Sequence, residues 1–271
     1  MNEDTFINSL RRRSPIIGDD CAVIASPGAK DLLFTTDFTI EGIHFRAKTS
    51  AAEVGRKAVA RSLSDIAAMG GTPRYCFISL ALSPSTNDRW LNSFYRGATR
   101  LLERHGVKLA GGDISHTSVF VCDVMVCGTI AKGQALLRSG ARPGDVIYVS
   151  GPLGGWRHKR TIVPRLEIGR QLIGKATACM DISDGLSLDL HRLALASGVA
   201  AALESIPLIK GASLRQALDD GEDYELLYTA RRGTHVPGIG IGTIVKGKPG
   251  TITLSGRPVP QRGYDHFQHR S

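Results

Sequence analysis

The chain has 271 residues, 42% of them hydrophobic, and this length lies near the point at which one core divides into two domains. Its 34 Lys and Arg against 25 Asp and Glu give a net charge of +9, which favours an anionic partner. No basic run exceeds Arg11-Arg12-Arg13, and no basic patch is interleaved with aromatic residues, so we do not expect that partner to be nucleic acid. Nucleotides and phosphorylated metabolites remain as candidates.

Membrane association and a disulfide framework are also not expected. The sequence contains no apolar run of 18 residues, and its N-terminus lacks a hydrophobic segment of the signal-peptide type. The five cysteines form no CxxC pair, and four of them lie within apolar runs, which is typical of reduced thiols in a core. We therefore expect a cytoplasmic protein.

The first half of the chain alternates strand and helix patterns. Residues 21–40 predict two strands joined by a Pro-Gly turn, and residues 53–70 predict a helix with Val59, Leu63 and Ile66 on one face. The following patterns predict a strand, a helix and two more strands, at 75–83, 83–106, 107–113 and 119–130. This order, β-β-α-β-α-β-β, is expected to form one mixed sheet with helices on one face.

The second half predicts a separate α/β unit. Helix patterns occupy 164–174 and 187–198, and strand patterns occupy 199–204, 224–230, 241–247 and 251–259. We place the boundary near 138–145 and expect an α/β (α+β) protein of two domains, 1–140 and 141–271.

Acidic residues recur where apolar segments end. Asp20, Asp37 and Asp113 each follow a turn or strand, and Asp181 and Asp184 occur together in the segment DISDG. Carboxylate oxygens gathered at strand ends suit Mg²⁺, and a site with several Mg²⁺ ions implies a polyphosphate. The phosphate-loop pattern GxxxxGK[ST] and the kinase pattern GxGxxG are both absent, so a different kind of nucleotide site is required.

Asp65 lies inside the predicted helix 53–70, unlike the other acids. Considered alone, it is expected to form a helical salt bridge with Arg61, four residues earlier. Ser183 is expected to cap the helix that follows DISDG, and Asp189 is expected to be a solvated or salt-bridged helix residue.

Seven segments in this order resemble the thiamine-monophosphate kinase family, which shares a superfamily with aminoimidazole ribonucleotide synthetase and selenophosphate synthetase. They are GDDCAVI, TTDFTIEGIHF, SLSDIAAMGGTP, LAGGD, RSGARPGD, MDISDGLSLDL and GEDYEL. EGIHF and GEDYEL resemble the kinase and not its superfamily relatives. The fold of the superfamily, with its two domains, is therefore expected.

The resemblance implies a phosphotransferase that uses ATP to convert thiamine phosphate to thiamine diphosphate, the last step of thiamine diphosphate biosynthesis. It further implies a homodimer that pairs through the N-terminal domains and several Mg²⁺ ions. Because the phosphate of such an acceptor is already anionic at neutral pH, no side chain is expected to act as general base. The positions that match magnesium ligands are Asp20, Thr35, Thr36, Asp37, Asp65, Asp113, Asp181 and Asp184. Those that match ATP contacts are Gly112, Asp113, Arg138 and Ser183, and those that match substrate contacts are His44, Glu222 and Tyr264.

Two departures from the family pattern fall in the second half. Only WRHKRTIV separates SGPLGG from PRLEIG, where the family has a longer helical insert, and Asp220 replaces a family glycine before GEDYEL. Two alternatives therefore stay open: a superfamily relative that uses ATP to activate another small substrate, and a protein that binds ATP or thiamine phosphate without turnover.

Overall fold

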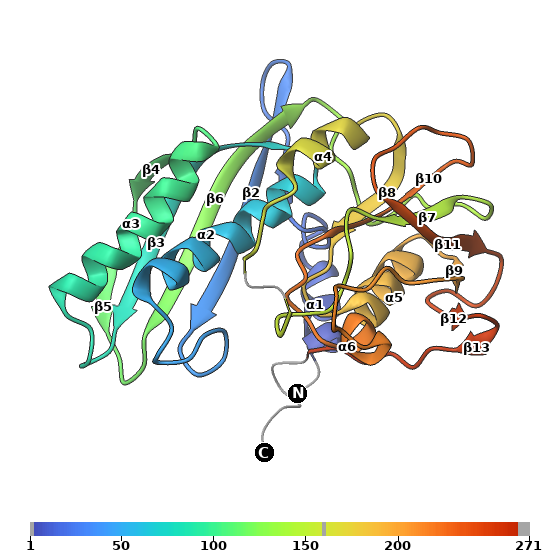
Figure 1. Ribbon diagram of the computed structural model, residues 1–271. Helices are drawn as coiled ribbons and strands as arrows, with labels where there is room; N and C mark the ends of the chain where they lie inside the picture. The colour runs from blue at the N-terminus through green and yellow to red at the C-terminus, as the bar shows by residue number, and fades with distance from the viewer. Residues whose placement is uncertain (1–2, 159–160, 265–271) are drawn as a thin grey trace.

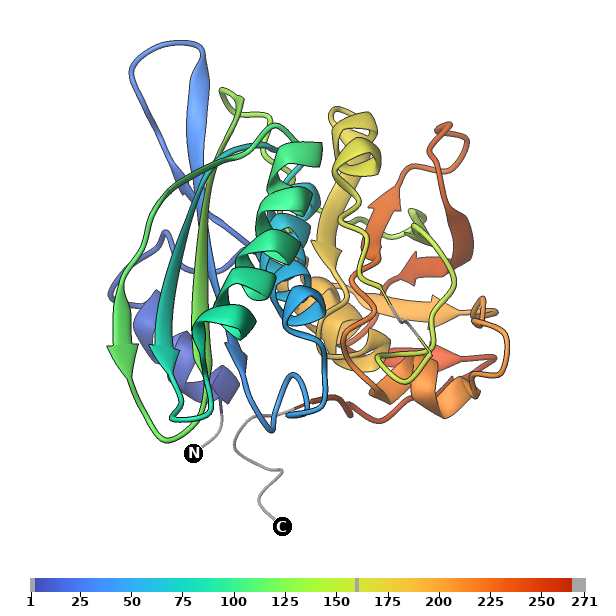
Figure 2. The same cartoon turned by 60° about the vertical axis from the view of Figure 1, so that its left-hand side comes forward.

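The computed structural model describes residues 3–158 and 161–264 and contains two sheets, one from each half of the chain (Figures 1 and 2). The first sheet has the order β1-β2-β6-β3-β4, with β5 paired to β3 beyond β4. Its strands are β1 (Ala22–Ile24), β2 (Lys30–Ile40), β3 (Thr72–Leu82), β4 (Lys108–Gly111), β5 (Ile114–His116) and β6 (Val121–Ala131). The pairs β1–β2, β2–β6 and β6–β3 are antiparallel, and β4 and β5 run parallel to β3, so the sheet is mixed as expected.

Two helices, α2 (Ala51–Ala68) and α3 (Asp88–Arg104), cover one face of this sheet (Figure 2). The side chain of Ser50 accepts from the backbone N–H of Glu53 and starts α2, and Asn87 starts α3 in the same way through Trp90. Alternate residues along β6 are buried beneath the helices, as period-two patterning requires. The opposite face, called here the open face, carries Phe38 and Tyr75, which are 56% and 50% exposed.

The second sheet has the order β13-β12-β9-β11-β7-β10-β8. Its strands are β7 (Val146–Val149), β8 (Ala176–Asp181), β9 (Ala200–Leu203), β10 (Leu226–Ala230), β11 (Ile239–Val245), β12 (Ile252–Leu254) and β13 (Arg257–Pro258). The helices of this half are α4 (Leu166–Leu172), α5 (Leu186–Ala196) and α6 (Leu214–Asp219). All of its strand pairs are antiparallel except β9–β12.

Helix α2 packs against both halves of the chain. One hydrophobic core joins α2 to the first sheet and continues into Leu226 and Tyr228 of β10, and a second core lies between β10 and α5. Every residue of β10 is buried, because both faces of this strand are covered. Helix α4 packs so closely on α2 that a Cβ added to Gly169 would lie 2.0 Å from the carbonyl oxygen of Ala67. Asp65, the predicted site residue on α2, is therefore held close to the second sheet.

The strands and helices predicted from the sequence are present, but the structure adds five elements and divides one predicted strand. Helices α1 (Glu3–Arg11) and α6 and strands β5, β7 and β8 were not predicted, and segment 251–259 forms the short pair β12 and β13 instead of one strand. Ser255, with φ of 49°, makes the turn between them. The domain boundary near residue 140 stays a prediction. None of the helices in the described ranges has the length and apolar character needed to cross a membrane.

Candidate active site

A cavity of about 1020 Å³ lies between the two halves of the chain. β2, the loop that follows it and α2 line one side, and the end of β8 together with residues 219–224 lines the other. This volume is at the upper end of the range for small-molecule sites, so the cavity has room for two ligands side by side.

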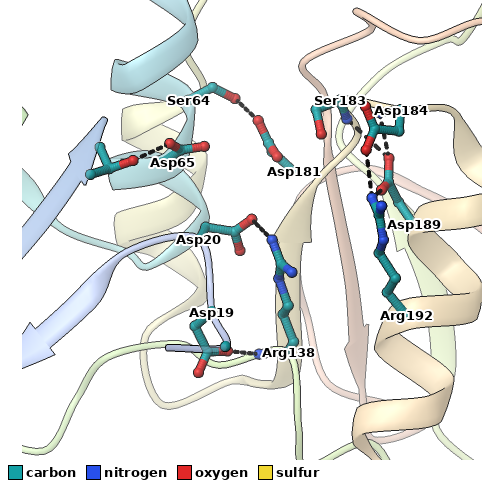
Figure 3. A network of polar contacts seen from close by, with 12 residues as sticks. Asp19, Asp20, Ser64, Asp65, Arg138, Asp181, Ser183, Asp184, Asp189 and Arg192 are labelled. Atoms are coloured by element: carbon teal, nitrogen blue, oxygen red, sulfur yellow. Dashed lines mark hydrogen bonds and ion pairs between the residues drawn. The ribbon is translucent and has the colours of Figure 1, made fainter. Parts of the chain in front are cut away.

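Three carboxylates meet in this cavity and are called here the acid cluster. Asp20 precedes β1, Asp65 lies on α2, and Asp181 ends β8; one carboxylate oxygen of each lies within 4.8 Å of the others (Figure 3). These segments are far apart in the sequence, so only the fold brings the three acids together.

The acid cluster is partly to fully buried, and the positive charge beside it is smaller than its own negative charge. Burial raises the pKa of Asp65 well above its ordinary range, and the charges of Asp37, Asp181 and Asp20 raise it further. Burial likewise raises the pKa of Asp181, and the charge of Asp20 adds to the effect, whereas a 2.6 Å hydrogen bond from the Ser64 hydroxyl opposes it. A group of acids in this state is ready to take up protons or a cation.

The neighbours of the acid cluster supply few donors. The Thr35 hydroxyl donates to Asp65, and Arg138 donates from Nη2 to Asp20 Oδ1 at 2.7 Å and from its backbone N–H to Asp19 Oδ1 at 2.7 Å. Among the described residues the buried Oδ2 of Asp20 has no hydrogen-bond partner. One guanidinium cannot balance three carboxylates, and hard oxygen ligands in this number fit Mg²⁺. The residues present therefore fit the metal that the family resemblance implies.

Asp37 and Thr36 extend the site along β2. Burial raises the pKa of Asp37, the charge of Arg61 lowers it, and the charges of Asp184 and Asp123 raise it. The Thr36 hydroxyl donates to Asp123 of β6 on the open face. Asp123 was not among the predicted site residues, and it does not line the cavity.

The segment DISDG is organised by Asp189. This fully buried carboxylate accepts the backbone N–H groups of Ser183 at 3.0 Å and Asp184 at 2.9 Å, and burial, followed by the charge of Asp184, raises its pKa to about 7. Arg192 Nη1 lies 2.6 Å from Asp184 Oδ2 and 3.1 Å from Asp189 Oδ1. Asp189 is thus salt-bridged as expected, but it is not solvated.

Ser183 does not cap α5, and that prediction was wrong. The helix begins after Gly185, and no side chain makes a capping hydrogen bond there. Asp189, one turn into the helix, takes the free amide hydrogens of residues 183 and 184 instead. The Ser183 side chain remains on the cavity wall.

Gly112 and Asp113 lie away from the acid cluster, in the turn between β4 and β5. A Cβ on Gly112 would lie 1.8 Å from the carbonyl oxygen of Ile78, so only glycine fits this approach to β3. The carbonyl of Asp113 accepts from the N–H of Leu80 on β3. Strand β6 lies between β3 and β2, so this turn is separated from β2 by two strands. Asp113 is exposed, so its predicted metal and ATP contacts stay predictions.

The predicted substrate residues line the same cavity. His44 is 9% exposed, and its Nδ1 accepts from the N–H of Ile40 at 3.0 Å. Lys57 joins His44 to Glu222, since its Nζ lies 2.5 Å from the carbonyl oxygen of His44 and 2.7 Å from Glu222 Oε2. Tyr264 also lines the cavity and donates its backbone N–H to the carbonyl of Asp184 at 3.0 Å.

Glu222 occupies a strained backbone conformation. Its φ is 69° and that of Tyr224 is 49°, values that non-glycine residues seldom adopt. Their N–H groups donate to Ser183 at 2.7 Å and Ile182 at 2.8 Å, so hydrogen bonds to the end of β8 hold the segment in place. Strain of this kind gathers at functional sites.

Comparison with known proteins finds relatives that cover nearly the whole chain. The family described as AIR synthase related protein, N-terminal domain, matches residues 18–130. The thiamine-monophosphate kinase of Salmonella typhimurium is 34% identical to this chain over an alignment that covers 93% of the chain and 91% of the relative. The chain belongs to the thiamine-monophosphate kinase family. The family member of Bacillus subtilis is 30% identical, with 93% of each protein covered.

Solved structures of the thiamine-monophosphate kinase family share the fold. AaThiL complexed with AMPPCP and TMP superposes with a TM-score of 0.92 at 30% identity and covers 98% of this chain and 97% of that one. The kinase from Aquifex aeolicus gives 0.83 at 29% identity, covering 95% and 97%. HypE, at 16% identity and 0.74, shares the fold alone. The Salmonella alignment spans 299 positions, more than the 271 residues of this chain, so the relative has residues that this kinase family member lacks.

Proposed function

We propose that this protein transfers the terminal phosphoryl group of ATP to thiamine phosphate, which yields thiamine diphosphate and ADP in the last step of thiamine diphosphate biosynthesis. The observation that carries the proposal is the buried acid cluster, which shares one cavity with His44 and Glu222, the family's substrate positions. Two anionic substrates must approach each other in this cavity, and an acid cluster that holds cations makes that approach possible.

The acid cluster is proposed to hold Mg²⁺, with Asp37, Thr35, Thr36 and Asp184 as further candidate ligands for several ions. The raised pKa values of Asp65 and Asp181 and the unpartnered oxygen of Asp20 support this assignment. When bound, Mg²⁺ would neutralise charge on the phosphoryl group in transit.

Arg138 and Ser183 are proposed to contact ATP beside the acid cluster. The guanidinium of Arg138 is already oriented by Asp20 at 2.7 Å, and its side chain retains 21% exposure toward the cavity. A planar guanidinium held in this way can bind phosphate oxygens with two parallel hydrogen bonds.

The acceptor end is proposed to comprise His44, Glu222 and Tyr264. The carboxylate of Glu222 complements the cationic thiazolium ring of thiamine phosphate, and the ring of Tyr264 offers a surface for stacking. A phosphate monoester has its second ionisation near pH ~6, so the attacking oxygen is already anionic at neutral pH. The protein's residues therefore bind and orient the acceptor, and none is needed as a general base.

The protein is further proposed to be a homodimer that pairs through the open face. A hollow of about 480 Å³ on this face is lined by Leu32, Phe34, Tyr75, Phe77 and Cys127. Apolar surface of this kind on a sheet with helices on one side only favours cover by a second copy. Gly112 and Asp113, which are proposed to contact ATP and Mg²⁺, follow β4 at the edge of the same sheet.

A cytoplasmic location is proposed as well. All five cysteines are free, and four of them are buried, which suits a reducing compartment.

A coupled assay of ADP release tests the proposed function. Turnover should require thiamine phosphate and Mg²⁺, and thiamine, aminoimidazole ribonucleotide precursors and selenide should not replace the acceptor. ADP release with one of those other substrates would indicate a superfamily relative, and binding of ATP and thiamine phosphate without ADP release would indicate a non-catalytic protein.

A further inference from the structure

Arg61 occupies a central position in the cavity that neither the sequence patterns nor the family positions assigned. It lies on α2, one turn before Asp65, and its side chain is 10% exposed. The helical spacing predicted a salt bridge to Asp65, but the guanidinium points elsewhere. Nη2 lies 3.3 Å from Asp37 Oδ1, and Nη1 lies 3.3 Å from Glu222 Oε1.

Arg61 forms longer hydrogen bonds than a structural arginine of the same protein. Arg165 binds the buried carboxylate of Glu225 with two short contacts, from Nε at 2.7 Å and from Nη2 at 2.5 Å. Arg61 instead makes one long contact to each of two acids, and within the described residues its buried Nε has no hydrogen-bond partner. The guanidinium fork, which is built for bidentate binding of an oxyanion, is therefore not filled by protein groups.

The two acids that flank Arg61 belong to opposite ends of the proposed reaction. Asp37 is a candidate metal ligand beside the acid cluster, and Glu222 is a candidate acceptor contact. If the proposed function holds, the phosphate of the acceptor must lie between these ends, because it receives the phosphoryl group there. That is the place where Arg61 lines the cavity.

We propose that Arg61 binds the phosphate group of the acceptor, a phosphate monoester, and that Asp37 and Glu222 are its counter-ions while the cavity is empty. This inference rests on the proposed function and adds a binding residue to it. Arg61 stays protonated throughout and takes part in no bond that forms or breaks; it orients the acceptor oxygen and offsets its charge.

The test compares two ligands that differ only in the phosphate. Binding of thiamine phosphate and of thiamine is measured by calorimetry, with Mg²⁺ and without ATP, on the wild type, Arg61→Met and Arg61→Lys. The quantity of interest is the dissociation constant of thiamine divided by that of thiamine phosphate. Arg61→Met should reduce this ratio by about 10- to 100-fold, the range for losing a charge-assisted hydrogen bond, and Arg61→Lys should recover part of it.

A role for Arg61 in merely holding Glu222 in place predicts a different result. Both ligands would then weaken by the same factor, and the ratio would stay at its wild-type value, which would overturn the proposal. The matched control is Arg56→Met on the same helix, since Arg56 donates to the carbonyl of Ile162 at 2.8 Å and does not line the cavity. Its ratio should not change.

Two further outcomes are informative. If Arg61→Met does not fold, Arg61→Lys decides the question alone, and an unchanged ratio in that folded variant would overturn the proposal. A wild-type protein that releases no ADP with thiamine phosphate would overturn the proposed function. A changed ratio of dissociation constants in the Arg61 variants cannot be confused with a lack of ADP release, because the ratio is measured without turnover.

Discussion

Replacement of Asp65 by Asn distinguishes a cation site from a structural hydrogen-bond network. Asn keeps the size of the side chain and an oxygen that can accept from the Thr35 hydroxyl. It removes a charge that lies within 4.8 Å of the oxygens of Asp20 and Asp181. Because burial and those charges raise the pKa of Asp65, its ionised form destabilises the native state. We therefore expect Asp65→Asn to be more stable than the wild type when no divalent cation is present.

The size of this effect follows from the geometry. Two unit charges 4.8 Å apart repel by roughly 3.5 kcal/mol at an effective dielectric constant of about 20. Partial protonation of the acid cluster relieves some of this repulsion, so the expected gain in unfolding free energy is about 1–3 kcal/mol. For a chain of this length the gain corresponds to a rise in Tm of roughly 2–10 °C. Turnover should fall by about two to three orders of magnitude, because a metal ligand contributes several kcal/mol to charge neutralisation.

Thermal unfolding in EDTA and in excess Mg²⁺, together with the ADP-release assay, measures both effects. Mg²⁺ should stabilise the wild type and have little effect on Asp65→Asn, so the order of stability should reverse between the two buffers. The control is Asp145→Asn. Asp145 is buried outside the cavity, and its Oδ2 accepts from the N–H of Arg142 at 2.9 Å and from the Thr177 hydroxyl at 2.7 Å, bonds that the amide oxygen of Asn can keep. Any change in stability should therefore be the same in both buffers.

The reasoning would be refuted by either of two results. An Asp65→Asn protein less stable than the wild type in EDTA by more than about 1 kcal/mol would show that Asp65 is a structural acceptor, since that is the value of a typical hydrogen bond. A variant with a near-normal rate would remove Asp65 from the metal site.

Three other predictions concern pH and assembly. Without divalent cations, stability should fall as the pH rises from about 4, the ordinary pKa of Asp, to about 7. Folding raises the pKa of acids such as Asp189, so in this range the folded protein keeps a proton that the unfolded chain has released. Urea midpoints across this range measure the effect, and a midpoint that increases with pH would contradict it. In the pH profile of kcat/KM for thiamine phosphate, the rate should rise through pH ~6 and stay level to about 8.5 in both the wild type and His44→Asn, which should bind the acceptor more weakly. Loss of that rise in the variant, with kcat reduced about a thousandfold, would instead make His44 the general base. Light scattering should show a dimer that Tyr75→Asp on the open face dissociates; a wild-type monomer at all concentrations would rule the dimer out.

Much of the fold could be predicted because its signals are local. Period-two alternation marks β6, and helical spacing together with the caps at Ser50 and Asn87 marks α2 and α3. Strand β7 escaped prediction because its four residues are too few to show a clear period-two pattern, and β8 because its last four residues are all buried and resemble any short apolar run. Helix α6 has only six residues, too few for a periodic pattern, and it starts with a capping box at Ser213.

The sequence alone determined the chemical identity of the acids and their position at the ends of apolar segments, because turn chemistry and strand patterning are read over a few residues. It also carried the motifs by which the family is identified. Those local features were sufficient to predict a metal-assisted phosphoryl-transfer site.

Only the tertiary structure decided which charges meet. Arg61 and Asp65 are four residues apart on one helix, and a surface helix would pair them, yet α2 is packed between two sheets and the guanidinium reaches Asp37 and Glu222. Asp189 likewise turns inward to the amides of residues 183 and 184. The physical reason is that a buried charge takes the partner that the packing brings within hydrogen-bond distance, and for residues 24 and 161 positions apart that distance is set by the whole fold.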